Sequence, residues 1–235
     1  MGTAASTPPP DLGARRNIPN YLTIARLVLA VAFFAVLTPW RYERSPVVLG
    51  GEGGIGVDWW LLGAAALFIL AAVTDALDGH LARKWGVVSV FGRIMDPFAD
   101  KLLVIGAFAF LAGPGFWVPG GDGAAGRQVS AVAPWMVALV LGRELLVTSI
   151  RGVLEGQGIS FAAGPSGKWK MILQSVVVPA VLVLLAVGAA EGRLGRAGAL
   201  TIPVLVWATV VVTVWSGWPY IGRAVAAVRQ MPSQS

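Results

Sequence analysis

The sequence contains no cysteine and a single histidine. Without thiols the protein can form no disulfide, thiol nucleophile or cysteine-ligated metal centre, and one histidine cannot build a histidine cluster. Charge is also scarce, because only 13% of the 235 residues are charged whereas 56% are hydrophobic, and the mean hydropathy is +0.73. Such a composition is typical of a polytopic membrane protein. Any metal ion bound here must therefore be held by oxygen atoms.

The basic residues outnumber the acidic ones by 18 to 12, which gives a formal net charge of +6. They are scattered at the ends of apolar segments and form no stripe, so attraction to anionic lipid headgroups explains them better than binding to nucleic acid. Seven of the ten Trp residues, Trp40 among them, lie at the ends of apolar runs, where an amphipathic ring suits the headgroup region. We interpret these residues as headgroup anchors. We therefore expect membrane lipids, and no nucleic acid, among the partners.

Six apolar stretches are each long enough, at about 20 residues, to span a bilayer. The sequence therefore predicts an all-α polytopic membrane protein with six transmembrane helices. A single membrane domain over residues 17–230 is expected between a flexible, Pro-rich tail at 1–16 and a short C-terminal tail at 231–235. The predicted spans cover roughly residues 21–40, 57–82, 92–112, 131–152, 170–190 and 200–221.

Six spans place both chain ends on one side of the membrane. That side carries ten basic residues near the span ends, against five on the opposite side. By the positive-inside rule, the protein lies in the cytoplasmic membrane with both termini in the cytoplasm. The ten are Arg15, Arg16, Arg83, Lys84, Arg93, Arg151, Lys168, Lys170, Arg223 and Arg229, and the five are Arg41, Arg44, Arg127, Arg193 and Arg196.

Four aspartates, Asp75, Asp78, Asp96 and Asp100, lie at the predicted cytoplasmic ends of the second and third spans. Spacings of three and four residues place each pair on one helix face, so two helices joined by a short turn could direct all four carboxylates to one point. Converging anions beside hydrocarbon are costly, and a divalent cation would compensate them. Oxygen ligands suit Mg²⁺ or Mn²⁺, and two ions about 4 Å apart suit phosphoryl chemistry.

Each of these residues alone also fits a simpler interpretation, as a helix-end charge that reaches water or as a helix cap. Asp96 followed by Pro97 is a helix-start pattern in particular. Gly79 would let a ligand approach the backbone, and Arg83 presents a fork suited to a diphosphate. Helix packing and a positive-inside anchor are the alternatives for these two residues.

The segment from Asp75 to Asp100 reads D-x2-D-G-x2-A-R-x8-G-x3-D-x3-D. This resembles the signature of the CDP-alcohol phosphotransferase family at every fixed position and at both spacings. Residues 17–26, Arg143 with Glu144 and Arg151, and residues 167–174 resemble the phosphatidylglycerophosphate synthase branch. The chain departs from that branch at residues 152–153, Gly-Val, where a Trp or similar bulky residue is usual.

The resemblance implies a six-helix fold, usually homodimeric, that binds CDP-diacylglycerol and displaces CMP with an alcohol. By position, Asp75, Asp78 and Asp96 would ligate metal, and Asp100 would both ligate metal and act as general base. The residues that match the family's contacts to the CDP part are Asn20, Thr23, Gly79, Arg83 and Ser89. A helix start for Asn20 and a satisfied hydroxyl for Thr23 are the simpler interpretations.

The branch implies glycerol 3-phosphate as the acceptor, and its phosphate would need cations near the four aspartates. Arg143 is the foremost candidate, because it lies inside an apolar span, where a charge costs at least about 2.5 kcal/mol unless it is paired or hydrated. Pairing with Glu144 or with another span is its alternative role. The cytoplasmic-side candidates are Lys101, Arg143, Arg151, Lys168 and Lys170.

Two other functions stay open at this point. The signature fixes only the CDP end, so an inositol phosphate or another small alcohol is an alternative acceptor. Carboxylates within a membrane can also mark a cation transporter. The position of these aspartates at span ends and the absence of an apparent internal repeat disfavour that reading.

Overall fold

The computed structural model describes residues 12–49, 56–85, 90–120, 125–156, 165–188 and 195–230. Within these ranges six long helices dominate, and the only strands form one short antiparallel pair that joins Trp117 to Gln128. The long helices are α1 (Leu12–Leu37), α3 (Trp59–Trp85), α4 (Val90–Leu111), α5 (Pro134–Gly156), α6 (Pro165–Ala186) and α7 (Gly195–Gln230). The short elements are η1 (Tyr42–Arg44), α2 (Pro46–Leu49), η3 (Pro114–Phe116), β1 (Trp117–Val118) and β2 (Arg127–Gln128).

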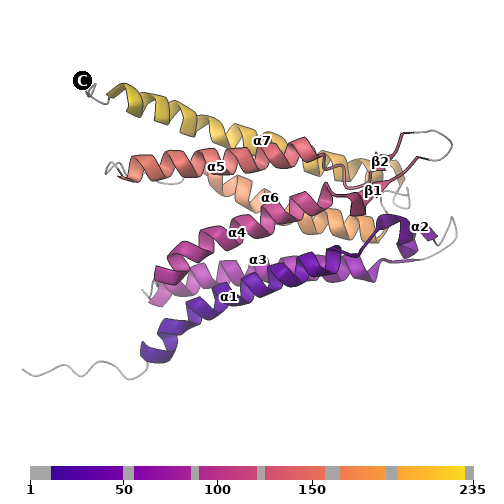
Figure 1. Ribbon diagram of the computed structural model, residues 1–235, viewed down its shortest axis with the longest axis horizontal. Coiled ribbons are helices and arrows are strands. Elements are labelled where there is room, and N and C mark those ends of the chain that lie inside the picture. Colours follow the sequence, from indigo (N-terminus) through magenta and orange to yellow (C-terminus); the bar gives the residue numbers. More distant parts are fainter. Residues whose placement is uncertain are drawn as a thin grey trace, which may run out of the picture.

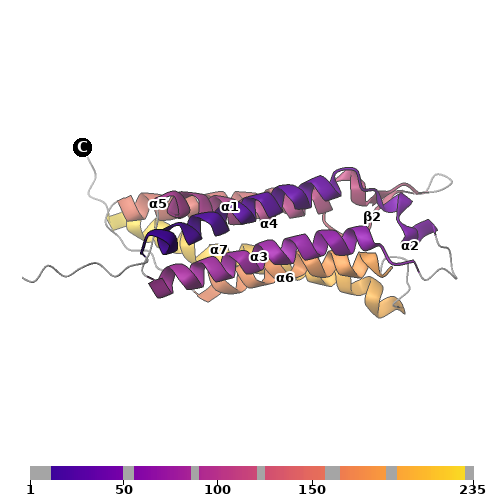
Figure 2. The ribbon, with the colours of Figure 1, turned by 90° about the horizontal axis from the view of Figure 1, so that it is seen from below.

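The long helices form an elongated bundle in which α1, α4 and α5 form one layer and α3 and α6 the other, while α7 runs obliquely and contacts both α5 and α6 (Figure 2). Helix α3 packs against α1 across the layers and against α6 within its own layer. The start of α1 and the end of α7 lie at the same end of the bundle, and α2, β1 and β2 lie at the other (Figure 1). Helix α1 begins at Leu12, inside the predicted N-terminal tail.

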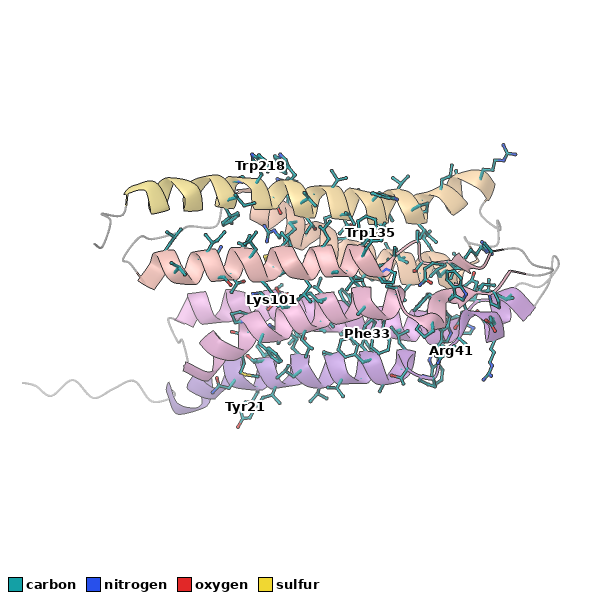
Figure 3. The ribbon with its side chains drawn as sticks, turned by 45° about the horizontal axis from the view of Figure 1, so that its top comes forward. Tyr21, Phe33, Arg41, Lys101, Trp135 and Trp218 are labelled. Atoms are coloured by element: carbon teal, nitrogen blue, oxygen red, sulfur yellow. The ribbon has the colours of Figure 1, made fainter. Side chains whose placement is uncertain are left out.

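Four of the described helices are long and apolar enough to cross a membrane, over Asn20–Leu37, Trp59–Leu77, Trp169–Ala186 and Arg196–Gly222. The helices also expose large apolar side chains, and Trp218 of α7 points away from the bundle (Figure 3). The predicted all-α membrane class is confirmed, and four of the six predicted spans correspond to these four helices. The other two predicted spans correspond to α4 and α5, of 22 and 23 residues, and their crossing stays a prediction.

The apolar core runs from α1, α3 and α4 into α6 and α7. Phe33 packs edge-on against Phe68 with ring centroids 5.6 Å apart, and Phe34 stacks on Phe110 at 5.3 Å. A side chain at Gly106 would collide with the Phe34 ring. The glycine therefore lets α4 approach α1 closely. This close approach supports the contact between Thr23 of α1 and Asp96 of α4, which lies nearer the start of both helices.

Asp58 organises the end of the bundle that carries the short elements. Its Oδ1 accepts the backbone N–H groups of Trp60 and Leu61 at 3.0 and 3.1 Å, which caps α3. Its Oδ2 accepts from Trp40 Nε1 at 3.0 Å and from Ser45 Oγ at 2.6 Å. The interpretation of Trp40 as a headgroup anchor is therefore wrong, because the ring is buried against a capping carboxylate.

Candidate active site

The acidic motif lies in two helices at the end of the bundle opposite Asp58. Asp75 lies on α3, and Asp96 and Asp100 lie on α4. Helix α3 also carries Asp78, Gly79 and Arg83, but only the backbone of these three residues is described. Ser89 lies outside the described residues.

Asp96 does not cap a helix. Helix α4 begins at Val90, six residues earlier, and continues through Pro97. The proline removes the N–H group that would bond to the carbonyl of Arg93, yet the helix holds on both sides. The interpretation of Asp96 as a helix cap is therefore wrong, because Asp96 lies within α4, in its second turn.

Helix α1 supplies a partner to each of two carboxylates. Thr23 Oγ1 donates a 2.6 Å hydrogen bond to Asp96 Oδ1, and Arg26 Nη1 lies 2.6 Å from Asp75 Oδ1. Both α1 side chains are fully buried, so they hold the carboxylates from the interior of the bundle. The Thr23 hydroxyl is thus satisfied, as its simpler interpretation predicts, and its contact with CDP stays a prediction.

Sequence reasoning missed Arg26. It lies within the apolar stretch of α1 and is 1% exposed, while Asp75 is 38% exposed. The argument applied to Arg143, that a charge inside an apolar span needs a partner, applies equally to Arg26 and would have found it.

Asp100 is half-buried and interacts with one anionic and three cationic side chains. It is repelled by Asp75 and attracted by Arg26, Lys170 and Lys101. The mutual repulsion of these carboxylates in a partly buried site is the situation that a divalent cation relieves.

The donors present fit Mg²⁺ or Mn²⁺, since all of them are carboxylate oxygens. Among the described side chains, no three carboxylate or histidine groups are grouped closely enough to hold an ion. Asp78, the fourth predicted ligand, is not among those side chains. The metal site therefore stays a prediction.

Cationic side chains from α4, α5 and α6 gather beside Asp100. Lys101 Nζ donates to Thr148 Oγ1 of α5 at 2.5 Å, and its label in Figure 3 lies between α4 and α5. Lys101 interacts electrostatically with Arg143 and Arg151 as well as with Asp100, and Lys170 interacts with Asp100, Arg143 and Lys101. The structure thus brings four of the five predicted acceptor-binding residues together, and the side chain of the fifth, Lys168, lies outside the described residues.

Glu144 is the shared anionic partner within this cationic group. Lys170 of α6 forms an ion pair with its Oε1, and Arg143 Nη1 lies 3.4 Å from the same oxygen. All three side chains are at least 87% buried. The alternative prediction of an Arg143–Glu144 pair is therefore correct in part, but Lys170 is the closer partner of the carboxylate.

Arg143 and Arg151 each have one buried donor, the Nε–H group, that makes no hydrogen bond within the described chain. A buried donor left unpaired costs about 1–3 kcal/mol. Such donors are therefore rare in native proteins and commonly mark a place where a ligand, ion or water binds. Both arginines interact electrostatically with Lys101, the residue next to Asp100.

Comparison with known proteins decides the family. Residues 16–215 match the family described as CDP-alcohol phosphatidyltransferase. The chain belongs to this family. The resemblance predicted from the D-x2-D-G motif is thus confirmed, and with it the prediction of an enzyme of this class.

Curated relatives place the chain more narrowly within the CDP-alcohol phosphatidyltransferase family. The chain is 35% identical to a CDP-diacylglycerol–glycerol-3-phosphate 3-phosphatidyltransferase from Bacillus subtilis, over 88% of this chain and 94% of that protein. A protein of the same name from Rickettsia bellii is 32% identical over 87% of this chain and 93% of its own length. Another from Cereibacter sphaeroides is 34% identical over 72% of this chain and 63% of its own length.

Proposed function

We propose that the protein transfers the phosphatidyl group of CDP-diacylglycerol to sn-glycerol 3-phosphate, giving phosphatidylglycerophosphate and CMP. The main support is the arrangement around Asp100, which interacts with Asp75 of the acidic motif and with the cations Lys101 and Lys170. The names of the similar proteins agree with this reaction.

At the donor end, we assign CDP binding to residues of α1, α3 and the connection that follows α3. Arg26 and Thr23 hold Asp75 and Asp96 in fixed orientations toward that end. When bound, one or two Mg²⁺ or Mn²⁺ ions would neutralise the diphosphate and the departing CMP. The proposed ligands are Asp75, Asp78, Asp96 and Asp100, and the proposed CDP contacts are Asn20, Thr23, Gly79, Arg83 and Ser89.

Asp100 is the proposed general base. Its carboxylate takes the proton from a hydroxyl of the acceptor as that oxygen bonds to the phosphatidyl phosphorus, and the bond from this phosphorus to the CMP oxygen breaks. A carboxylate is a weak base toward an alcohol, so it helps only when proton loss accompanies the attack. No covalent enzyme intermediate is required, and the chain contains no cysteine to form one.

The acceptor's phosphate fits the cationic group beside Asp100. Buried Nε donors of Arg143 and Arg151, with the ammonium groups of Lys101 and Lys170, suit a dianion better than a neutral hydroxyl. Lys168 is assigned to the same group from its position in the sequence. An inositol phosphate carries the same charged group and is therefore the second candidate acceptor.

The decisive experiment measures CMP release by the purified protein. CDP-diacylglycerol and Mg²⁺ or Mn²⁺ are supplied with glycerol 3-phosphate, inositol phosphate or glycerol in turn. We expect CMP only with glycerol 3-phosphate, and none after the metal is chelated. Absence of CMP with glycerol 3-phosphate, or equal release with inositol phosphate, would overturn the assignment.

We further propose a homodimer in the cytoplasmic membrane with both termini and the active site facing the cytoplasm. The start of α1 and the end of α7 lie at the same end of the bundle as the acidic motif (Figure 1). Ten of the fifteen basic residues considered above belong to that side, and soluble acceptor, nucleotide and metal ions are available there.

A further inference from the structure

Helix α7 contacts Arg143 through three residues that belong to no part of the family signature. Arg143 Nη2 donates to the Ser216 carbonyl at 3.1 Å and to Ser216 Oγ at 2.9 Å. The guanidinium carbon lies 5.7 Å from the centre of the Tyr220 ring. A Cβ atom at Gly217 would stand 3.4 Å from Arg143 Cγ, so the side-chain stem passes directly over this glycine.

These three residues form a continuous surface on one side of α7. Positions 216, 217 and 220 fall within about 100° of one another on a helix, and all three are buried. Each contacts a different part of the arginine, namely the Nη2 atom, the aliphatic stem and the face of the guanidinium. We call this surface the α7 cradle.

The α7 cradle occupies Arg143 without using all of its donors. Ser216 accepts from Nη2, Glu144 lies against Nη1, and the Tyr220 ring attracts the cation. The Nε donor is left buried and unpartnered within the described chain. The Arg143 guanidinium is thus held through Nη1 and Nη2, and its Nε donor can still bind an additional anion.

The same helix also fixes the neighbouring cation. Gln174, one turn after Lys170 on α6, donates through Nε2 to Thr213 Oγ1 of α7 at 3.1 Å. Thr213 lies one turn before Ser216, whose Oγ donates back to the Thr213 carbonyl at 2.8 Å. Helix α7 thus sets the separation between the helices that carry Arg143 and Lys170.

We propose that Ser216, Gly217 and Tyr220 are positioning residues that orient Arg143 toward the phosphate of the acceptor, so that α7 determines the affinity for the acceptor and not for the CDP-lipid. This inference rests on the proposed function, because it presumes a phosphorylated acceptor. The three positioning residues lie on the last helix, for which the sequence predicts only an apolar span.

The test is a comparison of the two KM values in the purified enzyme. Ser216→Ala removes the hydroxyl contact and Tyr220→Leu removes the ring. Each should raise the KM for glycerol 3-phosphate about tenfold, the size that one hydrogen bond to a charged group or one desolvated cation–π contact can carry. The KM for CDP-diacylglycerol should not change. Ser216→Thr keeps the hydroxyl and should have a KM close to the wild-type value. Tyr220→Phe keeps the ring and should have a lower acceptor KM than Tyr220→Leu.

Thr209→Val provides the matched control. Thr209 is also buried on α7, but its hydroxyl donates to the Leu205 carbonyl of its own helix at 2.9 Å. Both KM values of this variant should match the wild type. An unchanged acceptor KM in Ser216→Ala and Tyr220→Leu, or equal rises in both KM values, would overturn the proposal.

Two further results separate the possible failures. If the wild-type enzyme does not turn over glycerol 3-phosphate, the proposed function is wrong before any variant is made. If Ser216→Ala does not fold, the Tyr220→Phe and Tyr220→Leu pair decides alone, since equal acceptor KM values in these two variants would exclude a role for the ring.

Discussion

Two side chains of α1 orient the carboxylates of the acidic motif from the interior of the bundle. Arg26 pairs with Asp75, and Thr23 donates to Asp96. A carboxylate that holds a cation or orients a substrate works only in a fixed geometry, and outer partners commonly supply that geometry. Arg26 also attracts Asp100 electrostatically, so α1 influences the proposed base as well as the other two carboxylates.

Asp100→Asn tests the base at the scale of single atoms. The amide keeps the size of the side chain but cannot accept the proton, so CMP release should fall at least about 100-fold. The same carboxylate-to-amide change at Glu43, exposed on η1 at the far end of the bundle, is the control and should leave the rate unchanged. Full CMP release by Asp100→Asn would rule out the general-base role.

At the scale of helices, the approach of α4 to α1 depends on Gly106. Gly106→Leu would drive a side chain into the Phe34 ring, and such overpacking costs about 1–3 kcal/mol. It should also weaken the Thr23–Asp96 contact between the same helices. We therefore expect a lower thermal unfolding midpoint in detergent and reduced CMP release.

Gly63→Leu is the matched control for this helix contact. A Cβ atom at Gly63 of α3 would meet nothing within 4 Å, so the added side chain would face lipid. This variant should keep both its unfolding midpoint and its activity. If the two leucine variants behaved alike, the close approach at Gly106 would not be what supports the site.

Hydropathy predicted the helices well because span length and apolar content are local properties. The ends of the helices were less predictable. Asp96-Pro97 has the pattern of a helix start, yet α4 begins at Val90, because packing in the bundle maintains a helix around one missing hydrogen bond. Trp40 has the pattern of a headgroup anchor, yet it is buried against Asp58.

The candidate site was predictable in its charges but not in its pairing. The spacing of the aspartates and the position of Arg143 inside a span both indicate function from sequence alone. That Lys170 pairs with Glu144, or that Ser216 receives Arg143, depends on how α5, α6 and α7 pack. Such contacts join residues far apart in the chain, and no local pattern encodes them.

At the scale of the whole molecule, the absence of cysteine makes the orientation directly measurable. A single cysteine replacing Ser233, in the C-terminal tail, should resist a membrane-impermeant maleimide in intact cells and react after permeabilisation. A cysteine replacing the exposed Arg196, at the start of α7, should react in intact cells. The reverse pattern of labelling would place the acidic motif outside the cytoplasm and contradict the proposed topology.

The Arg26–Asp75 pair also bears on how the chain enters the membrane. Arg26 leaves the ribosome 49 residues before its counterion. An arginine inside an apolar span raises the free energy of insertion, by up to about 2.5–3.5 kcal/mol at the span centre. Isolated α1 should therefore insert less readily than its Arg26→Ala form, and extending the chain through α3 should remove most of the difference. The ion pair that orders the acidic motif thus makes the first two long helices depend on each other during biogenesis.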